Sequence, residues 1–447
     1  MLPYRPLACA LVLVSGAVLP AAAELSAPPT DPAVAAAIAR IAPNELRATD
    51  ARLVAFGTRS TFSLNAGPHR GVFAARDYLL ERFRAIARTS GGRMSVRLDT
   101  YTQKADGKRI PHDVVISSVV ATLRGDDPSG RAFVMSSHYD SRNTDNTDGV
   151  HDAPGADDNG SGTAAVLDAA RVLAPLPMHA TVIFACFDAE EQGLFGSAHL
   201  AQTLKAQHVD VQGDLNNDII GASVGDDGVK RDDEIRIFSE ALPQGADPAR
   251  INVIGGENDS PSRELARYVK ETSDAYPTGL HGTLIWRADR FLRGGDHESF
   301  NAQGFAAIRF TEPRENFRHQ HQNVRVENGI QYGDLMQYVD FDYLAKVTRY
   351  NAASLASLAL APAAPKASVL TKELTNDTTL AWDAVPRAVR YEVVERSTTD
   401  PQWSSVQDAG AATSVTLNVS KDNAIFGVRS VDAQGHRSLA AFPTPVR

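Results

Sequence analysis

The stretch Ala132-Phe-Val-Met-Ser-Ser-His-Tyr-Asp140 decides the fold class, because a short and almost wholly apolar run leads directly into polar residues. A second run of this kind, Thr181-Val-Ile-Phe-Ala-Cys-Phe187, follows a helical pattern over Thr163–Leu173. Short apolar runs that alternate with helices are typical of a largely parallel sheet covered on both faces. We therefore predict an α/β fold with a mostly parallel central sheet and helices on both faces.

Other segments extend this pattern in both directions. Residues 31–88 read as amphipathic helices. Further strands are predicted over 94–101, 114–123, 205–218 and 306–311, and a helix over 343–360 is expected to end the domain. Ligands and catalytic groups of such sheets gather at the carboxyl ends of the strands.

The C-terminal part has a different sequence pattern, one of short strands. The linker Ala361-Pro-Ala-Ala-Pro-Lys366 is followed by short strands separated by turn residues, which favours a small all-β sandwich. Trp382, Tyr391 and the segment Phe426–Val431 resemble a fibronectin type III module. The predicted organisation is a signal peptide at 1–23, a catalytic domain at 24–360, the linker at 361–366 and the sandwich at 367–447.

The N-terminus predicts export. Arg5, the apolar core Leu7–Leu19 and the small residues Ala21-Ala-Ala23 match a cleaved signal peptide, and the core is too short for a membrane anchor. We therefore expect a secreted or periplasmic protein. The formal charge of −9 argues against a nucleic-acid partner. Without the signal peptide only Cys186 remains, so no disulfide can form within the chain.

A set of nitrogen and oxygen donors lies near the ends of apolar runs. These residues are His138, Asp158, Glu190, Glu191, Asp218 and His319. Five of them suit two divalent metals, with one carboxylate able to bridge, and the sixth is left to take a proton from water. The set predicts a metallohydrolase.

The local motifs differ in how specific they are. The loop Pro154–Gly162 is rich in glycine and acid, and an N-cap role explains only one of its carboxylates. Glu190 and Glu191 repel each other at a strand end unless a cation is present. One of them can bind metal while its neighbour faces the water. Asp140 is expected to hold the far nitrogen of His138 if the chain turns at Ser141.

These motifs resemble the secreted zinc-dependent aminopeptidases of the bacterial leucyl aminopeptidase type, whose relatives include glutamate carboxypeptidases and glutaminyl cyclases. The resemblance covers about Ile110–Val347 and rests on Gly155–Gly162 and Ala189–Ser197. It implies two Zn²⁺ ions, with Asp158 as the bridging ligand in preference to Asp157. His138, Glu191 and Asp218 are then terminal ligands, and Glu190 is the general base.

The same resemblance makes His319 the last ligand. The family pattern His-x-x-x-Asp aligns His319 with a ligand, although Asn323 stands at the acidic position, and His321 is the alternative. Asp296 and His297 are expected to line the substrate site. Arg287, Arg290 and Arg293 offer positive charge for an acidic group, unless they are solvated surface residues.

The expected activity is hydrolysis of the N-terminal residue from peptides with a free amino terminus, by a water that two zinc ions and Glu190 activate. Three alternatives stay open. A carboxypeptidase or dipeptidase would use the same metals with a cationic clamp, a glutaminyl cyclase would bind one zinc and release ammonia, and a silent binding protein would keep only the fold.

Overall fold

The computed structural model describes residues 23–24, 27–64 and 66–446. Apart from Ala23, the predicted signal peptide lies outside these residues. The described chain forms two compact units: a larger one within residues 27–362 and 432–439, and a smaller one of residues 23–24, 363–431 and 440–446. The boundary between residues 362 and 363 falls within the predicted linker. The sequence pattern does not predict that residues 432–439 belong to the larger unit.

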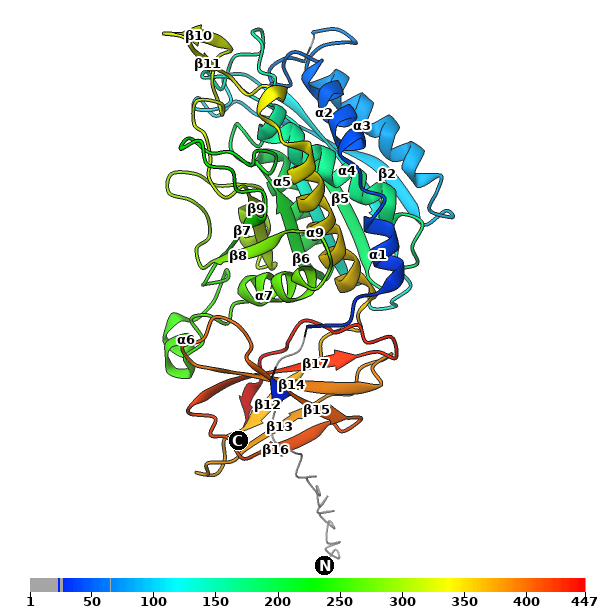
Figure 1. The fold of residues 1–447 in the computed structure, drawn as a ribbon, viewed down its shortest axis with the longest axis vertical. Coiled ribbons are helices and arrows are strands. Elements are labelled where there is room, and N and C mark those ends of the chain that lie inside the picture. Colours follow the sequence, from blue (N-terminus) through cyan, green and yellow to red (C-terminus); the bar gives the residue numbers. More distant parts are fainter. Residues whose placement is uncertain (1–22, 25–26, 65, 447) are drawn as a thin grey trace, which may run out of the picture. The chain divides into compact units, whose positions relative to one another are not determined.

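The larger unit is built on an eight-stranded sheet with the order β2-β3-β5-β4-β6-β9-β7-β8 (Figure 1). Its central strands β5, β4, β6 and β9 run parallel. β3 is antiparallel to β5 and β7 is antiparallel to β9, so the sheet as a whole is mixed. The strands are β2 (Met94–Gln103), β3 (Val114–Leu123), β4 (Ala132–His138), β5 (Thr181–Phe187), β6 (Val211–Asn217), β7 (Glu234–Ser239), β8 (His281–Ile285) and β9 (Ala307–Thr311).

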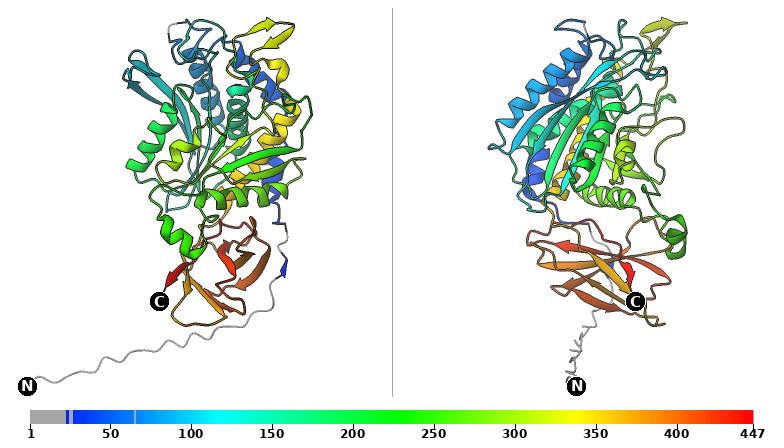
Figure 2. Two further views of the ribbon diagram at one scale, coloured as in Figure 1. Left: turned by 90° about the vertical axis from the view of Figure 1, so that its left-hand side faces the viewer. Right: turned by 180° about the vertical axis from the view of Figure 1, so that it is seen from behind.

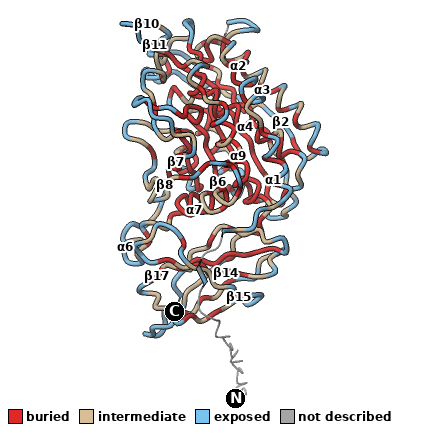
Figure 3. The backbone as a smooth tube through the Cα atoms, viewed as in Figure 1, coloured by how far each residue is buried: buried red, intermediate tan, exposed pale blue. Residues whose placement is uncertain are grey.

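Alternate side chains of the central strands enter two separate cores. In β5, Phe184 and Cys186 belong to one core, whereas Ile183, Ala185 and Phe187 belong to the other. A strand covered on both faces has no polar side, and this explains why the sequence of β5 is a continuous apolar run. The buried backbone accordingly concentrates in the sheet and in the helices α4 and α9 (Figure 3).

Helices cover both faces of the sheet, which confirms the predicted α/β class (Figure 2). One face carries α1 (Pro32–Ile38), α2 (Pro43–Val54), α3 (Val72–Ala87), α4 (Gly162–Leu173), α7 (Pro261–Asp274) and α9 (Phe341–Leu360). The other face carries α5 (Phe195–Ala206) and α8 (His297–Asn301). None of the helices in the described ranges has the length and hydropathy that crossing a membrane requires.

Two segments differ from the sequence prediction. The strand expected over 205–218 begins only at Val211, because Lys205 still belongs to the last turn of α5. Residues 221–294, which the sequence pattern left unassigned, contain β7, α6 (Pro248–Ile254), α7 and β8. The remaining elements of the unit are η1 (Ala156–Ser161), β10 (Arg325–Glu327), β11 (Ile330–Tyr332) and η2 (Met336–Tyr338).

The smaller unit is a sandwich of two four-stranded sheets. One sheet contains β12 (Ala367–Leu370), β13 (Thr378–Trp382), β16 (Ser414–Leu417) and β18 (Thr444–Val446), and the other contains β1 (Ala23–Glu24), β14 (Arg390–Ser397), β15 (Ser405–Gly410) and β17 (Ala424–Val431). Trp382 and Tyr391 come from different sheets and meet in one apolar core with ring centroids 5.6 Å apart. The all-β sandwich is therefore confirmed, and its assignment to fibronectin type III stays a prediction.

Candidate metal centre

The acidic and histidine side chains gather at the carboxyl ends of the central parallel strands. His138 is the last residue of β4, and Asp218 directly follows β6. Glu190 and Glu191 follow β5. Because these strands are parallel neighbours, their carboxyl ends meet at one edge of the sheet. Asp158 comes to the same edge from η1, the turn that leads into α4, and its peptide bond to Asn159 is cis.

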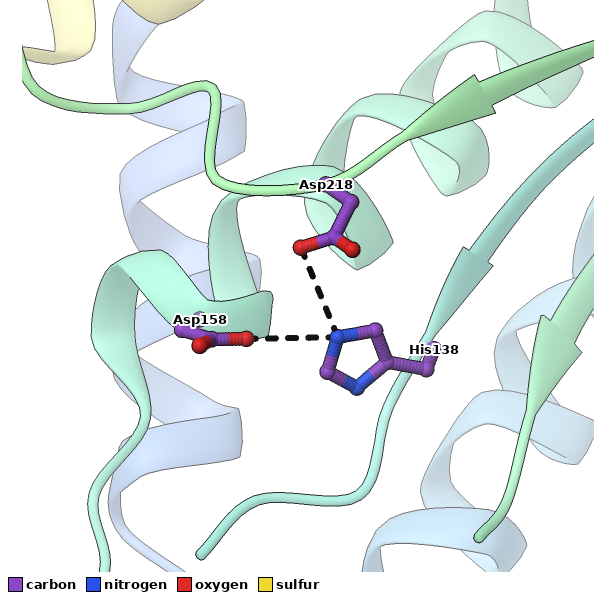
Figure 4. Close-up of side chains that lie close together, drawn as sticks. All are labelled: His138, Asp158 and Asp218. Carbon is purple, nitrogen blue, oxygen red and sulfur yellow. Dashed lines mark ion pairs between the residues drawn. The ribbon is translucent and has the colours of Figure 1, made fainter. Parts of the chain in front are cut away.

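His138, Asp158 and Asp218 form the first group of ligand atoms (Figure 4). The Nε2 atom of His138 lies 3.2 Å from Asp158 Oδ1 and 3.6 Å from Asp218 Oδ1. All three side chains are buried. Two carboxylates and one imidazole that converge on a single point make a set that suits a divalent cation.

Asp158 also belongs to a second group, with Glu191 and His321. The Nε2 atom of His321 lies 2.9 Å from Asp158 Oδ2 and 3.1 Å from Glu191 Oε1. Asp158 thus presents one carboxylate oxygen to each group. This is the arrangement expected of a carboxylate that bridges two cations.

Within the described part of the chain, four ligand atoms of this cluster have no hydrogen-bond partner. His138 Nε2, Asp158 Oδ2, Glu191 Oε1 and Asp218 Oδ1 are buried, and none makes a hydrogen bond of acceptable geometry. Buried polar atoms without hydrogen bonds are costly, and carboxylates in close approach repel one another. Cations bound between the two groups would satisfy these atoms, so the donor set fits two metal ions.

The prediction that His319 joins this cluster is wrong in its placement, and His321 takes the position. The ring of His319 stacks on Tyr338 with centroids 3.5 Å apart. Burial and the charge of Arg318 lower the pKa of His319 to about 4. Asn323, at the position where the family pattern has an acidic residue, accepts a hydrogen bond from the Thr144 N–H and donates one to the Thr144 hydroxyl.

Asp157, the neighbour of Asp158, points elsewhere. Its Oδ1 accepts a hydrogen bond of 2.7 Å from the N–H of Gly221. Burial raises the pKa of Asp157 to about 6, and its side chain is hydrogen-bonded to Glu312. The structure thus places Asp158 in the cluster and leaves Asp157 outside it.

Asp140 contacts the far nitrogen of His138, more closely through its main-chain oxygen than through its carboxylate. His138 Nδ1 lies 3.1 Å from the carbonyl oxygen of Asp140 and 3.4 Å from its carboxylate Oδ1. The two carboxylate oxygens also accept hydrogen bonds of 3.2 Å from the N–H groups of Glu190 and Glu191. Asp140 therefore orients the imidazole chiefly through its main-chain carbonyl and the glutamate pair through its carboxylate.

Glu190 stands apart from both ligand groups. Its Oε2 lies 4.0 Å from His138 Nε2, and its side chain faces the cavity described below. Burial and the nearby carboxylates of Glu191 and Asp218 raise the pKa of Glu190 well above its usual range. A carboxylate that is close to the ligands without belonging to either group is placed to exchange a proton with water.

Asp296 and His297 do not line the cavity, contrary to the sequence expectation. Both are fully buried. The Nε2 of His297 lies 2.9 Å from the carbonyl oxygen of Ala288. The wall of the cavity is formed instead by the residues that precede them, among them Arg293 and Gly294.

The structure adds supporting residues that the sequence gave no reason to select. Arg309 lies 3.0 Å from Asp218 Oδ2 and 3.0 Å from Asp289 Oδ2. Asp334 accepts hydrogen bonds from the N–H groups of Asp157 and Asp158, at 2.8 and 2.7 Å. Arg309 lies on β9 and Asp334 between β11 and η2, so no local motif connects either of them with the ligands.

The cavity at the cluster has a volume of 530 Å³. It is lined by Asp158, Glu190, Glu191, Asp218 and His321, by Arg109, Arg142 and Arg293, and by Gly193, Leu194, Leu292 and Gly294. Of the three arginines considered from sequence, only Arg293 lines it. Arg290 is paired with Asp289 and Glu315, and Arg287 lies over the ring of Phe291.

Comparison with known proteins agrees with this site. The model of peptidase family M28 matches residues 118–340. A probable zinc metalloprotease of Leptosphaeria maculans is 46% identical over 424 residues, which cover 94% of this chain and 98% of the relative.

Solved structures share the fold at low sequence identity. The LapA aminopeptidase of Legionella pneumophila has a TM-score of 0.52 at 19% identity, covering 75% of this chain and 77% of that one. A glutaminyl cyclase of Macrostomum lignano has a TM-score of 0.52 at 16% identity, covering 76% of this chain and 98% of that one.

Proposed function

Because this chain belongs to peptidase family M28 and is a zinc-dependent peptidase, we propose that it is an aminopeptidase with two zinc ions. It would remove the N-terminal residue from peptides with a free amino terminus. The observation that carries the proposal is the pair of ligand groups that share Asp158. We also propose export of the protein, on the basis of the signal-like residues 1–23.

Two sets of side chains would hold the ions. His138, Asp158 and Asp218 would hold one, and Asp158, Glu191 and His321 the other. When bound, the ions would polarise the scissile carbonyl and make water acidic enough to be deprotonated near neutral pH. The N–H groups of Glu190 and Glu191 donate to Asp140, which fixes the glutamate pair relative to His138.

Glu190 would carry the proton. Its carboxylate takes a proton from the attacking water and returns it to the leaving amine, so that it ends the cycle as it began. The carboxylate of Glu190, which lines the cavity and belongs to neither ligand group, would also attract the positively charged amino terminus of a peptide. This is our reason for preferring removal of the first residue over internal cleavage.

The fold alone does not choose between aminopeptidase and cyclase, since solved structures of both kinds share it. A dinuclear centre favours the peptidase, because the sequence-based expectation for a cyclase is one zinc. The second ligand group, Asp158 with Glu191 and His321, is the specific feature that supports two ions.

The test is zinc content by mass spectrometry, combined with release of p-nitroaniline from amino-acid p-nitroanilides. We expect two zinc ions per chain in the wild type and in Glu190→Gln, with kcat lower by about 10²- to 10⁴-fold in the variant. Glu81→Gln, an exposed glutamate on α3, is the matched control and should behave as the wild type.

Other outcomes would contradict the proposal. Lack of zinc in zinc-replete protein would refute the ligand assignment. One zinc with ammonia release from N-terminal glutamine would identify a cyclase. Release of the C-terminal residue from N-acetylated peptides would identify a carboxypeptidase.

A further inference from the structure

Three arginines converge on the cavity that contains the acidic cluster. Arg109 comes from the loop between β2 and β3, Arg142 from the loop after β4, and Arg293 from the loop before α8. Their positive charges share one cavity with the carboxylates of the proposed metal ligands. The ions would neutralise those carboxylates and leave the arginines as the charged part of the wall.

Within the described residues, none of these three arginines forms a close ion pair with an acidic side chain. Among the described residues, Arg109 and Arg142 form no ion pair, and their hydrogen bonds go to main-chain oxygens. Arg109 Nη1 donates to the Glu191 carbonyl at 3.4 Å, and Arg142 donates to the carbonyls of Asn143 and Thr144 at 3.0 and 3.1 Å. Arg293 forms one long ion pair, with Asp158 Oδ2 at 3.8 Å, and it also feels the charges of Glu315 and Asp218.

The neighbouring arginines show the contrast. Arg309 is fully buried between Asp218 and Asp289, and Arg290 is paired with Asp289 and Glu315. Their charges are balanced inside the protein. The three arginines of the cavity wall therefore form a distinct group, placed where a substrate would lie and lacking strong acidic partners.

The remaining wall argues against an apolar specificity pocket. Leu194 and Leu292 are the only large apolar side chains among its twelve lining residues, and Leu292 is fully exposed. A pocket for a neutral aliphatic side chain is lined mainly by apolar groups. Guanidinium groups instead match carboxylates, which they bind through paired hydrogen bonds.

We propose that Arg109, Arg142 and Arg293 bind a carboxylate of the substrate, and that the preferred substrates are therefore acidic at this position. The inference rests on the proposed peptidase function and names its substrate class. The carboxylate can belong to the side chain of an acidic N-terminal residue or to the free C-terminus of a very short peptide. Both sources present the same group to the arginines.

The loops of this wall are tied to the metal centre. Asn323 and Thr144 exchange two hydrogen bonds of 3.2 Å, joining the segment that carries His321 to the one that carries Arg142. Arg109 is joined through its bond to the carbonyl of Glu191. A carboxylate held by these arginines is thus positioned relative to both ligand groups, which is what selection of a substrate by its charge requires.

Two pairs of substrates separate the two sources of the carboxylate. Glutamyl-p-nitroanilide is compared with glutaminyl-p-nitroanilide, and leucylglycine with leucylglycinamide. In each pair only the carboxylate is replaced, by an amide of the same shape. We expect the acid of at least one pair to have a kcat/KM about 10- to 100-fold above its amide, since a hydrogen bond to a charged group contributes an energy of this order.

Variants of the arginines then test whether these residues cause the preference for the acid. Arg142→Gln and Arg109→Gln should each lower the acid-to-amide ratio at least about fivefold, mainly through KM, and Arg142→Lys should restore part of it. Arg287→Gln is the matched control, because Arg287 lies over Phe291 and does not line the cavity. A merely structural role of the arginines would lower both substrates of a pair equally and leave the ratio unchanged.

A binding measurement tests the role of the arginines even if the protein cleaves no peptide. Titration calorimetry with zinc-loaded Glu190→Gln compares leucylglycine with leucylglycinamide, and glutamate with glutamine, without any turnover. Tighter binding of an acid, lost in Arg142→Gln, supports the inference even if no peptide is cleaved. Equal kcat/KM and equal affinity within both pairs would overturn it, while normal cleavage of neutral substrates would leave the peptidase function intact.

Discussion

The guanidinium of Arg309 lies 3.0 Å from Asp218 Oδ2, while the other carboxylate oxygen of Asp218 faces His138. A cation of the protein thus holds one oxygen of this carboxylate and leaves the other for the metal group. The positive charge of Arg309 lowers the pKa of Asp218 despite its burial. Hydrogen bonds behind a ligand orient it and tune its affinity for metal.

Arg309→Met should therefore weaken zinc binding by about 10- to 100-fold in a titration against a competing chelator. It should also lower the free energy of unfolding by about 3–5 kcal/mol, because Asp218 would stay buried without its arginine and Asp289 would keep only Arg290 as an arginine partner. Arg309→Lys keeps the charge and should lose less. Arg314→Met removes an exposed arginine paired with Asp226 and serves as the control. An Arg309→Met protein with normal zinc affinity would contradict this role.

The two histidines of the same loop offer a matched pair of variants. His321→Ala should lower zinc affinity by more than the 10- to 100-fold typical of an outer partner, because it removes a proposed ligand. His319→Ala removes a ring stacked on Tyr338 and should leave the stoichiometry unchanged. Zinc per chain after dialysis at limiting free zinc measures both. The opposite result would restore His319 as the ligand.

Gly160 belongs to η1, the turn that carries Asp158, and it packs closely against Asp50 of α2. A Cβ added there would lie 2.1 Å from Asp50 Oδ1 and 2.9 Å from the carbonyl oxygen of Gly155. Gly160→Ala should therefore cost about 1–3 kcal/mol of stability through overpacking and should also weaken zinc binding. At Gly256 the nearest atom is the flexible Ile254 side chain at 3.3 Å, so Gly256→Ala should be close to neutral in thermal unfolding.

Asp188 should make stability depend on pH. Burial and the charge of Asp140 raise its pKa to about 7 in the folded protein, against about 3.9 when unfolded. The folded state thus keeps a proton that the unfolded chain releases. This proton stabilises the folded state fully below pH 4, and the stabilisation is lost as the pH rises towards 7. The free energy of unfolding then falls by at most about 1.4 kcal/mol per pH unit.

Urea denaturation of metal-free wild type and Asp188→Asn from pH 4 to 8 isolates this contribution. The stability of the wild type relative to the variant should fall between pH 4 and 7 and then level off. The other acidic groups titrate alike in both proteins, so their effects on stability cancel in the difference. A difference that does not change with pH would show that Asp188 stays ionised in the fold.

Much of this site could be predicted from sequence because its residues sit at the ends of recognisable strands. His138, Glu191 and Asp218 follow apolar runs whose parallel packing brings their ends together. Asp158 was identified by a motif rather than by periodicity, and the structure brings it to the other three.

The rest depended on tertiary contacts that leave no local pattern. His321 lies with the ligands while His319 stacks on Tyr338, and the segment is held by bonds from Asn323 to Thr144, which is far away in sequence. Arg109 and Arg142 reach the cavity from separate loops, while Arg290, a sequence candidate, is engaged by Asp289 and Glu315. Whether a charged side chain of a loop lines the cavity or is paired elsewhere depends on tertiary contacts that the local sequence does not show.

The shared position of Asp158 also has a kinetic consequence. Its two oxygens face histidines from distant parts of the chain, so both groups exist only after β4, η1 and the loop after β9 have come together. Contacts between remote segments form late in folding, because the intervening loops must first close. Interactions absent from the transition state slow unfolding and leave the folding rate almost unchanged. Zinc is therefore expected to determine how long the native protein survives, and not how quickly it forms.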